Sequence, residues 1–112
     1  MNITGVVIRR AVDDLATAVP FYEMLTGTQA HRFRFANSEL AAIGPFLLLT
    51  PGQGAERLAN VAATITVDDL SEAQELLTTH GAEIIAPVAA TPNGRRLIAR
   101  HPDGAIFEYV SR

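Results

Sequence analysis

One short motif occurs twice in the chain. "AVDDLATA" at 11–18 is echoed by "TVDDLSEA" at 66–73, an offset of 55 in a chain of 112 residues. An extended apolar run precedes each copy, "ITGVVIR" in the first case and "NVAATITV" in the second, and apolar residues at helical spacing follow it. The repeat therefore predicts two halves that share one order of elements.

Each half reads as a strand, a helix and three further strands. An Asp of each Asp-Asp pair can cap its helix, and Gly27 and Gly81 end the two helices. The later strands are predicted at 29–35, 39–43, 46–50, 82–88, 95–100 and 105–110. The turns between them are marked by Asn37-Ser38, Gly44-Pro45, Pro92-Asn93-Gly94 and Pro102-Asp103-Gly104. The chain is thus predicted to be one α+β domain, 1–112, with βαβββ units at 1–50 and 61–112 and a linker at 51–60.

Composition excludes several classes of function. The chain has no cysteine, which rules out disulfides and thiolate metal sites. The net charge is −3, and a mildly acidic chain is a poor nucleic-acid binder. No apolar run approaches membrane-spanning length, and no signal-peptide pattern is present. We therefore expect a cytoplasmic protein with no nucleic-acid or membrane partner.

Two longer motifs resemble a known family. "VDDLATAVPFYEMLTG" and "HPDGAIFE" are similar to patterns of the vicinal-oxygen-chelate superfamily, and the likeness covers essentially the whole chain. That superfamily includes glyoxalase I, extradiol dioxygenases, methylmalonyl-CoA epimerase, fosfomycin-resistance enzymes and bleomycin-resistance proteins. The resemblance implies mixed sheets that curve around a cleft, with the helices on the outer face.

The resemblance also implies where a metal would bind. In metal-dependent members a Glu at the end of the last strand is a ligand, and Glu108 occupies that place. The family's ligand positions in the first strand of each unit fall on Val7 and Ala62 here, and the strand ending the first half offers Leu48 and Thr50. One carboxylate is too few for a catalytic metal, and the three histidines share no ligand spacing. We therefore expect no metal and no other cofactor.

Strand alternation predicts which side chains line the cleft. Phe107 and Tyr109 would face the helix-covered core, so Glu108 would point the other way; a solvated sheet face is the alternative. Arg9 could pair with Glu108 or extend into solvent. The predicted cleft residues are Gly5, Val7, Arg9, Leu48, Thr50, Ala62, Thr64, Thr66 and Glu108.

Aromatic residues are the other candidates for a site. Phe21 and Tyr22 on the first helix are predicted to pack in the core. Phe33 and Phe35 alternate with arginines in the next strand. We expect this second pair in the core as well, and an aromatic wall for a planar ligand is the alternative.

Two hypotheses about function follow. The first is a protein that binds a small organic molecule without a catalytic metal, with antibiotic sequestration as one form of this. The second is a lyase, isomerase or dioxygenase-type enzyme that uses Glu108 as general base or metal ligand. In either case we expect a homodimer, in which βαβββ units of two chains meet and complete the clefts.

Overall fold

A computed structural model describes residues 1–35, 38–50, 60–91 and 94–112. Asn37 and Pro92-Asn93, which were expected in turns, lie outside the described residues. So does the predicted linker apart from Asn60. The predicted turns at Gly44-Pro45 and Pro102-Asp103-Gly104 are present.

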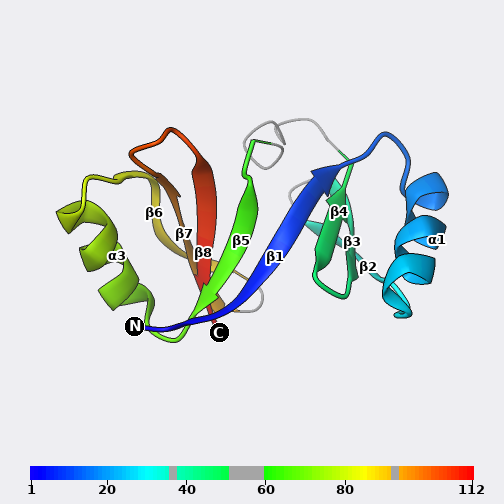
Figure 1. Ribbon diagram of the computed structural model, residues 1–112, viewed down its shortest axis with the longest axis horizontal. Coiled ribbons are helices and arrows are strands. Elements are labelled where there is room, and N and C mark those ends of the chain that lie inside the picture. Colours follow the sequence, from blue (N-terminus) through cyan, green and yellow to red (C-terminus); the bar gives the residue numbers. More distant parts are fainter. Residues whose placement is uncertain (36–37, 51–59, 92–93) are drawn as a thin grey trace. The chain divides into compact units, whose positions relative to one another are not determined.

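The chain divides into two compact units (Figure 1). Residues 8–60 form the N-terminal unit, and residues 1–7 together with 61–112 form the C-terminal unit. Strand β1 (Ile3–Ala11) contributes to both, because its first half belongs to one unit and its second half to the other.

Each unit has the predicted βαβββ order, which confirms the α+β fold. In the N-terminal unit the strand order is β2-β3-β4-β1, and in the C-terminal unit it is β5-β8-β7-β6, with the first half of β1 next to β5. The β1–β4 and β5–β8 pairs are parallel, while the β2–β3, β3–β4, β6–β7 and β7–β8 pairs are antiparallel. The remaining elements are α1 (Leu15–Thr26), β2 (His31–Phe35), β3 (Ser38–Ile43), β4 (Phe46–Leu49), β5 (Ala63–Val67), α3 (Leu70–Thr79), β6 (Glu83–Thr91), β7 (Gly94–Arg100) and β8 (Ile106–Ser111).

The two Asp-Asp pairs cap the helices, as predicted. The Asp14 carboxylate accepts the backbone N–H of Ala16 at 3.1 Å, and that of Asp69 accepts the N–H of Glu72 at 3.0 Å. Hydrogen bonds from the Thr17 hydroxyl and then from the Ala16 N–H hold the pKa of Asp14 below its ordinary value. Neither α1 nor α3 is long and apolar enough to cross a membrane.

Each helix covers one face of the sheet in its own unit. Helix α3 packs against β6, β7 and β8, and α1 packs against β3 and β4. The buried core under α3 consists of Ile65, Val67, Leu70, Ala73, Leu97, Ala99 and Tyr109. The buried core under α1 consists of Leu15, Val19, Ala41, Ile43 and Leu48. Burial of these side chains is the main favourable term holding each helix to its sheet.

The structure corrects the expected direction of Leu48. This side chain is fully buried in the core under α1, so it does not line the sheet face where we had placed it. The reason is register: Leu48 pairs with Ala41 of β3, which is also fully buried under the helix. Thr50 follows the end of β4, and both its N–H and its hydroxyl donate to the Glu39 carbonyl oxygen, at 3.0 and 3.3 Å.

This placement predicts unequal effects of two neighbouring truncations. Leu48→Ala should lower the free energy of unfolding by about 2–5 kcal/mol, because it leaves a cavity under α1. Leu47→Ala should cost clearly less, because Leu47 is only half-buried and points to the opposite face of β4. Urea denaturation of both variants measures the difference, and equal losses would contradict the observed register.

Candidate functional site

Glu108 lies on the face of β8 that points away from α3. Its neighbours Phe107 and Tyr109 pack on the helix side, where Tyr109 is a buried member of the core and Phe107 packs against it. Because strand side chains alternate, Glu108 between them must point to the opposite face, as predicted. The side chain is partly buried. We call this surface the Glu108 face.

A hydroxyl group holds the Glu108 carboxylate. The Thr64 Oγ1 atom donates a hydrogen bond of 2.8 Å to Glu108 Oε1. The two residues are direct partners in the parallel β5–β8 ladder, so backbone pairing sets their separation. A hydrogen bond to an ionised acceptor is stronger than one between neutral groups, and Thr64 itself is buried. The carboxylate is therefore held in a defined orientation.

Apolar and hydroxyl groups surround this pair. Ile98 of β7 is the ladder partner of Glu108 and is almost fully buried, while Val110 pairs with Thr66 one step along the strands. A Cβ atom on Gly5 would lie 2.7 Å from Thr66 Oγ1, so a larger residue at position 5 would force the Thr66 side chain to shift. The Glu108 face thus combines one carboxylate and two hydroxyls with apolar side chains.

Within the C-terminal unit, the structure brings several of the predicted site residues together. Thr64, Thr66 and Glu108 share the Glu108 face. Ala62 is exposed just before β5, where its N–H donates to the Ile106 carbonyl oxygen at 2.8 Å. Val7 is half-buried in β1 and belongs to the same unit.

Arg9, Leu48 and Thr50 belong to the N-terminal unit. Arg9 is buried, and its pairing with Glu108 stays a prediction. Ile98 and Val110 were missed by the sequence analysis. Counting back from the Pro102-Asp103-Gly104 turn along the β7–β8 hairpin would have identified Ile98 as the partner of Glu108.

The expected core positions of three phenylalanines are wrong. Phe33 and Phe35 on β2 are 38% and 41% exposed, and Phe21 on α1 is 55% exposed. The His31 ring stacks on Phe33 with centroids 5.8 Å apart. Tyr22, by contrast, packs against the core under α1, as predicted.

His101 packs on the α3 side of β8. Its Nε2 atom lies 2.6 Å from the Tyr109 hydroxyl, and its ring stacks on Phe107 with centroids 4.4 Å apart. Burial raises the pKa of Tyr109 above its ordinary value. These contacts tie the turn before β8 to the core, so they give His101 a structural role.

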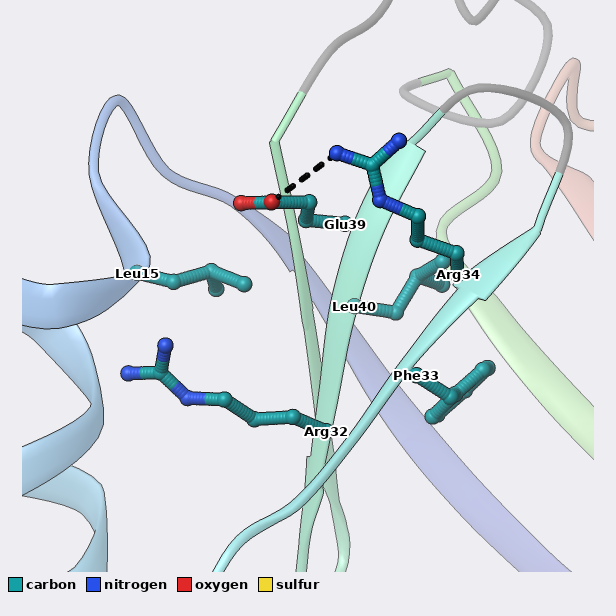
Figure 2. A pocket seen from close by; sticks show the side chains of 6 residues that line it. All are labelled: Leu15, Arg32, Phe33, Arg34, Glu39 and Leu40. Atoms are coloured by element: carbon teal, nitrogen blue, oxygen red, sulfur yellow. Dashed lines mark hydrogen bonds and ion pairs between the residues drawn. The ribbon is translucent and has the colours of Figure 1, made fainter.

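A hollow of about 240 Å³ lies elsewhere, between the start of α1 and strands β2 and β3 of the N-terminal unit (Figure 2). Arg34 and Glu39 form an exposed ion pair of 3.2 Å at its edge. Arg32 extends toward α1, and its charge contributes to the lowered pKa of Asp14. The Glu39 carboxylate pairs with one of the two guanidinium groups that line the hollow. The residues that line it are Leu15, Arg32, Phe33, Arg34, Glu39 and Leu40.

Comparison with known proteins identifies the family. The model of the Glyoxalase/Bleomycin resistance protein/Dioxygenase superfamily matches residues 6–109. The chain belongs to this superfamily. No curated protein gives a significant match.

Several solved structures have a similar fold. An uncharacterized protein from Methanosarcina mazei is 38% identical, with a TM-score of 0.88 over 100% of this chain and 94% of that one. Methylmalonyl-CoA epimerase from Mycobacterium tuberculosis is 21% identical, with a TM-score of 0.74 over 97% of this chain and 88% of that one. BphC, a halotolerant catechol dioxygenase, is 16% identical, with a TM-score of 0.64 over 100% of this chain and 40% of that one.

The residues at the superfamily's metal positions do not fit a metal ion. Val7 and Ala62 offer no side-chain donor atom, Leu48 is turned into the core, and the Thr50 hydroxyl donates to the Glu39 carbonyl oxygen. Glu108 is the one carboxylate at these positions. Within the described parts of the chain, no group of three or more His, Asp or Glu side chains could hold a metal ion. A catalytic metal usually needs about three protein ligands.

This donor set predicts that the purified protein will not retain a divalent metal. We expect substoichiometric Ni, Zn, Fe, Mn and Mg by elemental analysis. We also expect no rise in melting temperature when these ions are added, because only a ligand that binds the folded state stabilises it. One tightly held equivalent that disappears in Glu108→Ala would contradict this prediction.

Proposed function

We propose that this member of the glyoxalase superfamily binds a small, partly apolar organic molecule on the Glu108 face, without a catalytic metal. The observation that supports this most directly is the Glu108 carboxylate, held by Thr64 on the sheet face opposite α3. Small-molecule sites typically combine apolar walls with a few well-placed polar groups. Ile98 and Val110 supply the apolar part of such a site.

The chemistry of the face defines the class of ligand. An ionised carboxylate accepts hydrogen bonds at several positions, so Glu108 can accept from an N–H, an O–H or a cationic group of the ligand in addition to Thr64. The Thr66 hydroxyl can donate or accept beside it. Antibiotic sequestration is one function of this kind, because it requires binding without chemistry.

An enzyme is the second candidate. Thr64 holds the Glu108 carboxylate in a fixed orientation, as a general base requires, and proton transfer needs the base within hydrogen-bond distance of the proton that it removes. Two solved structures of similar fold are named as an epimerase and a catechol dioxygenase. In this alternative Glu108 acts on the bound molecule without a metal.

Replacing Glu108 by Gln tests both candidates. A thermal-shift screen with antibiotics and small amines, alcohols and acids would first identify a ligand. Glu108→Gln keeps the shape and removes the charge, so affinity should fall by about 1.5–3 kcal/mol, roughly ten- to a hundredfold. Thr64→Val should weaken binding less, because it removes only the group that orients the carboxylate. Isothermal titration calorimetry measures both losses.

Glu75→Gln is the matched control, because Glu75 is an exposed carboxylate on α3. It should leave affinity unchanged. If Glu108→Gln binds as tightly as the unmodified protein and no turnover is lost, Glu108 has no role in the site and the proposal is wrong. If affinity persists but a measured turnover disappears, the enzymatic alternative is the correct one.

The proposal includes a homodimer and a cytoplasmic location. In the described part of the chain, one helix packs on one face of the sheet in each unit. The other face of each sheet is therefore available to a partner. Light scattering at micromolar concentration should therefore give twice the monomer mass of 12.0 kDa. A mass of one chain at that concentration would rule the dimer out. Cell fractionation tests the location.

A further inference from the structure

Three exposed apolar side chains lie on one flank of α1. Phe21, Met24 and Leu25 are 55%, 73% and 58% exposed. Their spacing of three and four residues places them side by side along the helix. Exposed apolar residues that form a contiguous group mark an interaction site more often than scattered ones do.

The neighbouring contacts show which way this flank faces. On a helix, residues two positions apart point about 200° apart, so Glu23 lies on the opposite side from Phe21 and Leu25. Glu23 reaches back to accept the Ala30 N–H at 2.8 Å, just before β2. The apolar flank therefore faces away from β2, toward β4 and β1.

A chain of contacts extends the apolar surface from α1 onto the sheet. The Tyr22 ring lies between Phe21, with centroids 5.3 Å apart, and Phe46 of β4, with centroids 4.9 Å apart. Phe46 in turn pairs with Ile8 of β1, which is 44% exposed. We call this surface the α1–β1 patch; it consists of Ile8, Phe21, Tyr22, Met24, Leu25 and Phe46.

The second copy of the repeat lacks such a patch. At the offset of 55, Phe21, Met24 and Leu25 correspond to Leu76, Thr79 and His80, so two of the three positions are polar in the second copy. Helix α3 also carries Glu72 and Glu75, whereas Glu23 is the single charged residue of α1. A helix with apolar residues around most of its circumference is usually buried by neighbouring structure on most sides. The additional apolar residues that α1 exposes therefore indicate a contact of α1 that α3 does not share.

We infer that the α1–β1 patch is covered by the α1–β1 patch of a second copy of the chain, related by a twofold axis. This rests on the proposed homodimer and locates its contact. The patch contains no Asp, Glu, Lys, Arg or His, so two copies meet without opposing like charges although each chain carries a net charge of −3. A membrane surface is a poorer occupant, because α1 has no Lys or Arg to meet lipid headgroups.

The size of the patch agrees with this occupant. Fully covered aromatic side chains bury about 150–250 Å² each, so the exposed parts of the six residues offer roughly 500 Å² per copy. Two copies would bury about 1,000 Å², which reaches the lower limit of specific interfaces. The patch is therefore about the smallest area that a specific dimer contact would use.

Charged substitutions on the two helices test the location. Phe21→Glu and Met24→Glu place carboxylates opposite one another across the twofold axis, and both sites tolerate a charge in the monomer because they are exposed. Each should raise the dimer dissociation constant about tenfold or more, measured by analytical ultracentrifugation. Leu76→Glu is the matched control, because Leu76 is the repeat partner of Phe21 and is 42% exposed on α3. It should leave the dimer intact. Circular dichroism and melting temperature confirm that each variant is folded.

The possible results separate this inference from the wider proposal. Folded Phe21→Glu and Met24→Glu variants that remain dimeric would overturn the location and leave the dimer standing. Equal dissociation of Leu76→Glu would overturn the location too. An unmodified protein that is monomeric would overturn both the location and the dimer. A monomer that sediments with phosphatidylcholine vesicles would do the same and would assign the patch to lipid binding. Ligand binding at Glu108 is measured separately and is not decided by any of these results.

Discussion

A single helix can cover only one face of a sheet, and in the described part of the chain each unit has a single helix. Burial under α3 orders Leu97 and Tyr109, and burial under α1 orders Ile43 and Leu48. The opposite face of each sheet does not pack against the helix of its unit, so it can carry polar side chains. This division explains why polar groups of the C-terminal unit, including Glu108, gather on the face away from α3.

The core and the candidate site are coupled through strand alternation. Phe107 and Tyr109 belong under the helix, and His101 stacks on the first and contacts the second. Glu108 therefore has no freedom to turn to the other side. A slip of one residue would bury an ionised carboxylate under α3, which is costly without a partner, and would expose two aromatic rings. The packing of two aromatic residues thus sets the direction of the carboxylate.

The two copies of the repeat kept one fold and diverged in their surfaces. Val7 and Ala62 lie at corresponding positions of the two copies, and neither has a side-chain donor atom for a metal ion. The helices diverged as well, since α3 is polar on its outer side while α1 exposes Phe21, Met24 and Leu25. A shared fold is therefore compatible with different uses of each half.

The sequence alone determined the repeat, the element order, the helix caps and the direction of Glu108. These features depend on local rules: the period of strands, the period of helices and the capping preference of Asp. Only the tertiary structure decided that Leu48 lies in the core, that Thr64 binds Glu108, and that Phe33 and Phe35 on β2 are exposed. These depend on cross-strand register and on β2 being an edge strand of its unit, and both are set by residues far apart in the chain.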